Sequence, residues 1–148
     1  MDRTKFIKTC GMVCLAGSAL PVLFQRCGFA KTITGSIQGS DLVVPLTDFE
    51  TNAANEIRFK KYVIVNNEAL KFPICVYRHD NQNYTALWMQ CTHQGAELQV
   101  FGDKLQCPAH GSEFDAKGNV TNSPADKNLR SFPVTVFHDQ LKISLKAV

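Results

Sequence analysis

The sequence has few of the features that mark a nucleic-acid-binding, membrane-spanning or helical protein. Beyond residue 30, lysine and arginine form no long run, and twelve basic residues balance twelve acidic ones. A domain of zero formal charge gives no electrostatic reason to expect a nucleic-acid partner. No uncharged stretch reaches the roughly 20 residues that a spanning helix needs, and no segment after residue 30 sustains a helical period. The 148 residues suit one compact domain with a short extension.

Cysteine is too unevenly placed for a disulfide framework. The chain has six cysteines, and those at positions 10, 14 and 27 lie within the first 30 residues. The other three are Cys75, Cys91 and Cys107. A dense set of disulfides therefore does not fit the remainder, and metal binding is the better interpretation. Cys75, in the apolar run 72–76, is predicted to be a buried core thiol.

Residues 1–30 have the order of an export signal: a basic cluster, an uncharged stretch from Thr9 to Phe24, and small residues before Lys31. The segment Arg3–Lys8 resembles a twin-arginine signal in which Thr4 replaces the second arginine. We therefore predict a cleaved signal peptide and a mature protein on the periplasmic side. A short uncleaved N-terminal membrane anchor and a terminus without a targeting role stay as alternatives.

The rest of the chain has the pattern of an antiparallel β protein. Residues 31–40 are rich in Thr, Gly and Ser and are predicted to form a tether. From Asp41 onward, short apolar or alternating runs are separated by Gly, Asn and Asp, which is typical of strands. The expected strands are Leu42–Leu46, Ile57–Val65, Phe72–Tyr77, Tyr84–Gln90, Leu98–Phe101 and Val134–Leu145, and the expected hairpin turns are Gly102-Asp103, Lys117-Gly118 and His138-Asp139. The fold class is therefore all-β.

One pattern of residues carries the chemistry. Cys91 and His93 stand one residue apart, and thirteen residues later Cys107 and His110 stand two residues apart. Each short loop thus offers one sulfur and one nitrogen ligand, and the residues between the loops are enough for a hairpin that returns the second loop beside the first. In a Rieske centre two cysteines bind one iron and two histidines the other, so both loops must reach both metals. The spacing meets that demand.

A structural zinc site is the first rival for the same four residues, because two thiolates and two imidazoles are also zinc ligands. Zinc does not require the glycines that follow each histidine, Gly95 and Gly111, where a side chain would crowd a loop around an inorganic cluster. Nor does it require Ser112. Pro108 holds the second loop rigid. These details favour an iron-sulfur centre.

The two boxes Cys91–Gly95 and Cys107–Ser112 resemble the cluster-binding boxes of the Rieske [2Fe-2S] iron-sulfur protein family. Further along, Gly118 and Pro124 resemble the glycine turn and proline loop of that family. The resemblance implies an antiparallel β-sandwich-like Rieske domain over residues 41–148, with a small cluster-binding subdomain at about 90–125. It implies one [2Fe-2S] cluster per chain. The implied ligands are Cys91, His93, Cys107 and His110, and the implied surrounding residues are Gly95, Pro108, Gly111, Ser112, Phe114 and Pro124.

The chain departs from the pattern of quinol-oxidising members at several positions. Ala96 and Ala109 stand where those proteins carry two cysteines joined as a disulfide that braces the loops. Phe114 replaces a tyrosine whose hydroxyl bonds a ligand sulfur, whereas Ser112 is retained. Gln94 replaces a leucine that shields the cluster. The resemblance thus implies a variant that lacks the disulfide.

The implied function is one-electron transfer by a protein with no substrate site of its own. Ring-hydroxylating oxygenases add a second, mononuclear iron site with two histidines. Apart from the four ligands only His79 and His138 remain, and both are predicted to be solvated surface residues. Export favours a redox partner in a membrane-associated respiratory oxidoreductase, such as a cytochrome or an oxidoreductase subunit. A cytoplasmic ferredoxin that supplies an oxygenase is the alternative.

Overall fold

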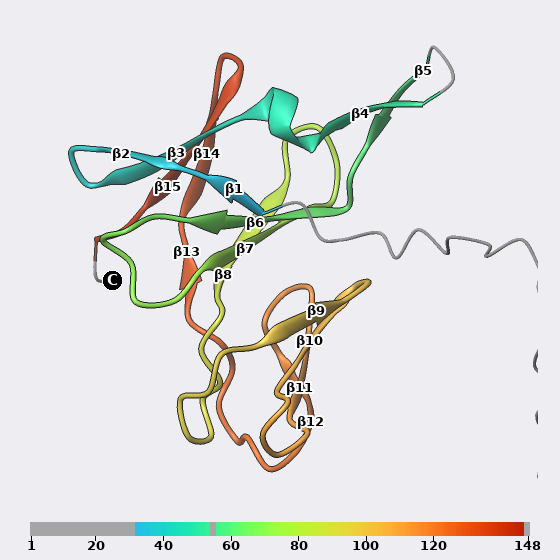
Figure 1. Ribbon diagram of the computed structural model, residues 1–148, viewed down its shortest axis with the longest axis vertical. Helices are drawn as coiled ribbons and strands as arrows, with labels where there is room; N and C mark the ends of the chain where they lie inside the picture. The colour runs from blue at the N-terminus through green and yellow to red at the C-terminus, as the bar shows by residue number, and fades with distance from the viewer. Residues whose placement is uncertain (1–31, 54–55, 147–148) are drawn as a thin grey trace, which may run out of the picture.

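The computed structural model describes residues 32–53 and 56–146, and within them nearly all regular structure is β-strand (Figure 1). The predicted leader, residues 1–30, lies outside the described residues. The strands are β1 (Thr32–Thr34), β2 (Ser36–Gln38), β3 (Asp41–Pro45), β4 (Glu50–Ala53), β5 (Glu56–Phe59), β6 (Tyr62–Asn66), β7 (Ile74–Arg78), β8 (Tyr84–Trp88), β9 (Gln99–Phe101), β10 (Lys104–Gln106), β11 (Glu113–Asp115), β12 (Val120–Asn122), β13 (Ser131–Phe132), β14 (Val134–Phe137) and β15 (Gln140–Ser144). One 3₁₀ turn, η1, spans Leu46–Phe49. No helix of the described residues is long and apolar enough to cross a membrane.

Two sheets form the larger, upper part of the molecule in Figure 1. The first has the order β1-β6-β7-β8-β13, and the second has the order β14-β15-β3-β2. Both contribute side chains to one core, among them Val63 and Val76 from the first sheet and Leu42, Val44 and Leu141 from the second. Because successive side chains of a strand point to opposite faces, each sheet turns one face to this core. The all-β, sandwich-like architecture expected from the sequence is confirmed.

A smaller sheet of order β12-β11-β10-β9 forms the lower part of the molecule (Figure 1). It packs through a second core against the opposite face of the first sheet. Strand β7 explains the link, because Ile74 and Val76 face the first core while Cys75 and Tyr77 face the second. A continuous apolar run is what a strand buried on both faces requires.

The predicted tether is wrong for residues 32–40, the part that the structure describes. Strand β1 pairs in parallel with β6, with Ile33 opposite Val65, and β2 pairs with β3. The Ile33 side chain is buried in the first core. A Cβ on Gly35 would lie 2.7 Å from side-chain atoms of both Leu42 and Val65. This glycine therefore allows close packing and does not provide flexibility.

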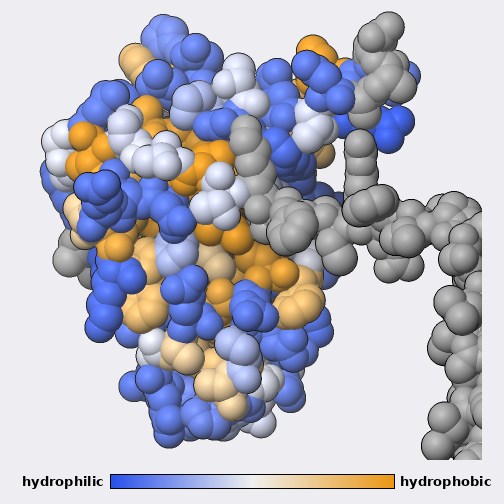
Figure 2. All heavy atoms as spheres, in the orientation of Figure 1, coloured by the Kyte–Doolittle hydropathy of each residue, from blue (hydrophilic) through white to orange (hydrophobic). Residues whose placement is uncertain are grey.

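The predicted strand Ile57–Val65 is two strands, β5 and β6, because the ladder breaks at Lys60 and the chain bends at Lys61. The Lys60 amide donates to the Phe49 carbonyl at 2.7 Å, and its ammonium donates to the carbonyls of Asp48 and Glu50 at 3.0 Å each. Strand β5 pairs with β4 in a hairpin that projects from the upper sheets (Figure 1). Figure 2 shows hydrophobic and hydrophilic residues side by side on this arm.

The predicted turns at 102–103 and 138–139 are confirmed, since Phe101 pairs with Lys104 and Phe137 with Gln140. The turn between β11 and β12 contains the predicted Lys117-Gly118 pair. Gly118 has a φ of +87°, and a Cβ there would lie 2.8 Å from a Leu87 methyl carbon. Both its backbone conformation and its contact with the second core therefore require glycine.

Candidate metal centre

Two short loops at the lower end of the molecule share one backbone pattern. In the first loop, the Cys91 amide donates to the Ala96 carbonyl at 2.8 Å, and the Gly95 amide donates to the Cys91 carbonyl at 2.9 Å. In the second, the amide of Cys107 donates to the carbonyl of Ser112 at 2.8 Å, and the amide of Gly111 donates to the carbonyl of Cys107 at 2.9 Å. Each loop is therefore a closed turn that starts at a cysteine.

Strands hold both loops in place. The first loop follows β8 and is closed by an isolated bridge between Gln90 and Glu97. The second connects β10 to β11, whose pairing places Gln106 opposite Glu113. Because the intervening hairpin of β9 and β10 turns at Gly102, the chain returns to the same end of the sheet. The sequence predicted this return, and the structure contains the hairpin.

The four predicted ligands form two pairs. The thiols of Cys91 and Cys107 are free, buried and within hydrogen-bonding reach of one another. The imidazole rings of His93 and His110 lie 5.0 Å apart between centroids, at an interplanar angle of 88°. His110 is exposed and His93 is half-buried. The loops thus bring sulfur beside sulfur and nitrogen beside nitrogen.

The backbone around Cys107 favours a negative charge on its sulfur. Burial raises the pKa of the Cys107 thiol, but hydrogen bonds from the backbone amides of His110 and Ala109, together with one from Cys91, lower it below its ordinary value. The thiolate is the form that binds metal. The second loop is therefore arranged for a charged sulfur ligand.

The imidazole of His93 supplies an independent test of whether the loops fit a metal cluster. Its Nδ1 atom is buried and has no hydrogen-bond partner among the described residues. Buried polar atoms are nearly always paired, so an unpaired ring nitrogen calls for an explanation. A metal bond to Nδ1 provides one, and the donor set of two sulfurs and two nitrogens fits a [2Fe-2S] centre with mixed ligands. No three Cys, His, Asp or Glu side chains in the described ranges gather around a single metal position.

A strap of residues 122–127 fastens the two loops together. The Thr92 hydroxyl donates to the Lys127 carbonyl at 2.6 Å, and the Asn122 side chain donates to the Gly111 carbonyl at 3.0 Å. The Ala125 amide donates to Ser112 Oγ at 3.0 Å. Because Ser112 Oγ accepts this bond, its own proton stays available to donate. Thr92, Asn122 and Lys127 were not predicted from the sequence as part of the centre.

The other predicted neighbours of the centre fall into two groups. Ser112 and Phe114 are fully buried, and Phe114 belongs to the second core. Pro108 in the second loop and Pro124 in the strap are exposed, and the peptide bond before Pro124 is cis. The loops thus pack against the second core on one side and are exposed to solvent on the other.

Cys75, His79 and His138 lie where the sequence predicts them, and Met89 and Trp88 pack in different cores. Cys75 is completely buried, and Met89 belongs to the second core. Trp88 is half-buried and packs against the first core. Both His79 and His138 are exposed.

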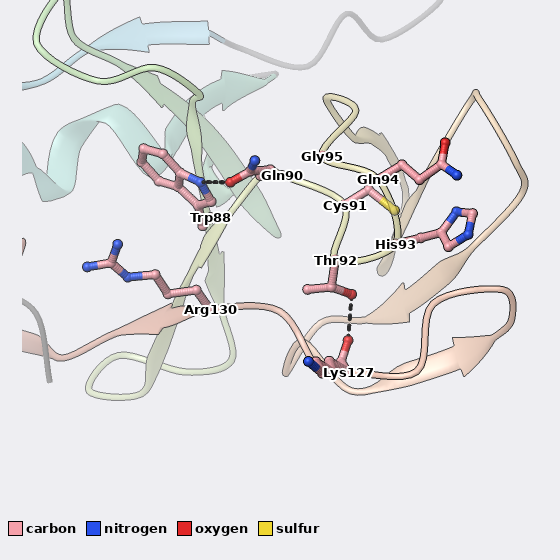
Figure 3. Close-up of a pocket in the computed structure, with 9 residues that line it drawn as sticks. All are labelled: Trp88, Gln90, Cys91, Thr92, His93, Gln94, Gly95, Lys127 and Arg130. Carbon is pink, nitrogen blue, oxygen red and sulfur yellow. Dashed lines mark hydrogen bonds between the residues drawn. The ribbon is translucent and has the colours of Figure 1, made fainter.

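A pocket of about 510 Å³ adjoins the first loop (Figure 3). It is lined by Trp88, Gln90, Cys91, Thr92, His93, Gln94, Gly95, Lys127 and Arg130. In Figure 3 the indole of Trp88 points away from the imidazole of His93, and the first loop runs between them. The Trp88 indole N–H donates to Gln90 Oε1 at 2.9 Å.

Comparisons with known proteins show which family this chain resembles. A family model described as the Rieske [2Fe-2S] domain matches residues 49–133. The chain is 39% identical over 56 residues to the cytochrome b6-f complex iron-sulfur subunit 2 of Nostoc sp., which covers 36% of this chain and 32% of that protein. It is 37% identical over 75 residues to the oxygenase component of dicamba O-demethylase from Stenotrophomonas maltophilia, which covers 44% of this chain and 22% of that protein. The chain thus spans about a third or less of the length of these curated relatives.

A solved structure extends the likeness to three dimensions. The cyanobacterial plasma membrane Rieske protein of Synechocystis PCC 6803 superposes with a TM-score of 0.50 at 26% identity, over 57% of this chain and 86% of that one. The matched family model covers more than half of the chain and includes both loops and the strap. The chain therefore belongs to the Rieske [2Fe-2S] domain family, whose cofactor is a [2Fe-2S] cluster.

Proposed function

We propose that Cys91 and Cys107 bind one iron of the cluster and that His93 and His110 bind the other. The observation that carries the proposal is the pairing of like ligands across the two loops, thiol beside thiol and imidazole beside imidazole. The unpaired, buried Nδ1 of His93 supports the assignment of imidazole as a ligand. When bound, the cluster accepts and releases one electron as one iron changes between its ferric and ferrous forms.

The protein around the loops then acts as a rigid holder for the electron carrier. Apolar packing beneath Cys91 and Cys107, which are 3% and 2% exposed, excludes water from the sulfur side. His110 is exposed, so its imidazole lies at the surface of the protein. A fixed framework that changes little between oxidation states favours fast electron transfer, since little reorganisation is needed.

We propose further that the chain works as a subunit or partner of a membrane-associated respiratory oxidoreductase on the periplasmic side of a membrane. The signal-like order of residues 1–30 supports export. Two relatives are named as an iron-sulfur subunit of the cytochrome b6-f complex and as a plasma membrane Rieske protein. Both names fit an electron carrier at a membrane.

A soluble ferredoxin that supplies an oxygenase is the second candidate. A relative named as the oxygenase component of dicamba O-demethylase supports a link between this chain and oxygenase systems, in which a ferredoxin is the electron donor. Gln94 on the rim of the first loop also supports it, because this side chain is exposed and polar where a dry quinol-docking surface would be apolar.

Two measurements test these proposals. Iron, sulfide and zinc analysis of the purified protein is expected to give two irons and two sulfides per chain, whereas one zinc and no sulfide would support the structural zinc site. Cell fractionation with N-terminal sequencing tests the location. Mature protein that starts near Lys31 in the periplasm supports the respiratory role, and an intact Met1 in the cytosol supports the ferredoxin role.

A further inference from the structure

The pocket beside the first loop is positively charged, although the chain beyond residue 30 has no net formal charge. Lys127 and Arg130 line it, and no Asp or Glu does. Its other polar groups include the side chains of Gln90, Gln94 and Thr92, which carry no charge. Beyond residue 30 the basic and acidic residues are equal in number. This pocket is therefore a local positive site on a domain that is formally neutral.

Neither cation is neutralised by a carboxylate in the part of the chain that the structure describes. The ion pairs between Arg58 and Glu56 and between Lys104 and Glu113 involve no residue that lines this pocket. Asp126, which precedes Lys127 in the sequence, and Glu97, which follows the first loop, are both exposed, but neither lines the pocket. The side chains of Lys127 and Arg130 are both exposed, so their charges face solvent.

The backbone that presents these cations is fixed to the first loop and to β8. The Lys127 carbonyl accepts the Thr92 hydroxyl at 2.6 Å, and the Arg130 carbonyl accepts the Trp88 amide at 2.9 Å. The Arg130 guanidinium lies 4.7 Å from the centroid of the Phe132 ring. Figure 3 shows both residues on the chain segment that faces the first loop across the pocket. Groups that are already ordered lose less entropy when a partner docks.

We infer that this pocket is the docking site for an acidic redox protein, whose surface carboxylates pair with Lys127 and Arg130. The inference rests on the proposed electron-transfer function, because the pocket borders Cys91 and His93 and a partner seated there lies next to the centre. Local charge complementarity steers association even when the net charge is zero. Trp88 in the wall adds an aromatic surface of the kind that contributes much of the binding energy at protein interfaces.

The test compares two protein probes that differ in charge. Cytochrome c is basic, and its succinylated form is acidic with the same haem. Binding of each to the full-length protein as isolated is measured by isothermal titration calorimetry at low and high ionic strength. The wild-type protein is expected to bind the succinylated form and not the basic form, and added salt is expected to weaken the binding.

Two double variants of equal net charge decide the matter. The double variant that combines Lys127→Gln with Arg130→Gln is expected to bind succinylated cytochrome c about tenfold more weakly at low ionic strength. The control pair Lys61→Gln and Lys146→Gln, exposed cations that do not line the pocket, is expected to leave this binding within about twofold. Equal weakening in both pairs, or a preference of the wild type for the basic form, would overturn the inference.

The calorimetry is independent of the proposed electron transfer. Stopped-flow oxidation of the reduced protein by each cytochrome, in which one electron passes to the haem iron, is measured on the same variants. If the protein holds no reducible cluster, the proposed function fails while the binding result still stands. If the cluster is reducible and the pocket variant binds like the control, only the docking site is wrong.

Discussion

Gly95 and Gly111 occupy equivalent places in the two loops of the candidate centre. Each stands four residues after a cysteine, donates its amide to that cysteine's carbonyl at 2.9 Å, and has a positive φ, of +78° and +80° respectively. Residues with a side chain rarely adopt this backbone conformation. The two glycines therefore close two turns of the same shape, which present one cysteine and one histidine each.

Replacing Gly111 by alanine tests this relationship. No atom lies within 4 Å of a Cβ added there, so the cost comes from the left-handed backbone alone and amounts to about 1–2 kcal/mol. We expect a lower melting temperature and less iron and sulfide per chain. Gly111→Asn is expected to recover much of the iron, since asparagine tolerates this conformation.

Gly39→Ala is the matched control for that variant. Gly39 also has a positive φ, of +63°, and open space around its Cβ position, but it lies in the turn between β2 and β3. A similar loss of stability with full iron content is expected. If Gly39→Ala loses as much iron as Gly111→Ala, the second loop has no special dependence on its glycine.

Removing the Thr92 hydroxyl should loosen the first loop from the strap. Thr92→Val keeps the side-chain shape and deletes the hydrogen bond to the Lys127 carbonyl. A loss of about 1 kcal/mol is expected. The measurement is the urea concentration at which the visible absorption of the cluster is lost. Thr135→Val, on the exposed face of β14, should leave this midpoint unchanged, and an equal shift in both would contradict the role of the strap.

The turn between β11 and β12 gives a pH dependence of stability. Burial raises the pKa of Asp115, but hydrogen bonds from Asn119 and from the amides of Lys117 and Gly118 lower it below its ordinary value. A lowered pKa in the folded state stabilises the fold above the unfolded value of about 3.9, and this contribution is lost as the pH falls through the folded value. The wild type should therefore exceed Asp115→Asn in stability near neutral pH, and the difference should shrink below about pH 4. Urea unfolding of both proteins at several pH values measures this difference in stability. A difference that does not change with pH would contradict the lowered pKa of Asp115.

Cys75 should be inert in the folded protein. Burial raises the pKa of its thiol to about 12, so the thiolate that reacts with alkylating reagents is absent at neutral pH. Treatment with iodoacetamide at pH 8, followed by peptide mass mapping, should leave Cys75 unlabelled in the native protein and labelled in guanidinium. Rapid labelling of Cys75 in the folded state would show that the second core opens.

The sequence was informative where local spacing determines structure and less so where distant contacts do. The hairpin turn at Gly102-Asp103 could be predicted because two neighbouring runs of residues and a turn pair are enough to specify it. The prediction of a flexible tether at residues 32–40 was wrong because Gly35, a residue typical of flexible segments, is packed against Leu42 and Val65. At the break between β5 and β6, Lys60 donates to carbonyls more than nine residues away, and no local pattern reveals these contacts.

At the candidate centre, too, local spacing could be predicted from the sequence and contacts between distant residues could not. The paired spacing of Cys91, His93, Cys107 and His110 pointed to these four residues as the candidate ligands, since each loop is a local turn. The bond between Thr92 and Lys127 joins residues 35 positions apart, and threonine and lysine are ordinary surface residues. Only the fold brings them together. The basic pocket beside the centre was missed for the same reason.

The most direct test of the account is pulsed electron paramagnetic resonance of the dithionite-reduced protein, alone and as His110→Cys. We predict a rhombic signal whose average g value lies below that of an all-cysteine [2Fe-2S] cluster, with couplings from two imidazole nitrogens that His110→Cys reduces to one. A sample that gives no signal and contains zinc, or a signal without nitrogen coupling, would contradict the proposed ligands and with them the proposed electron transfer.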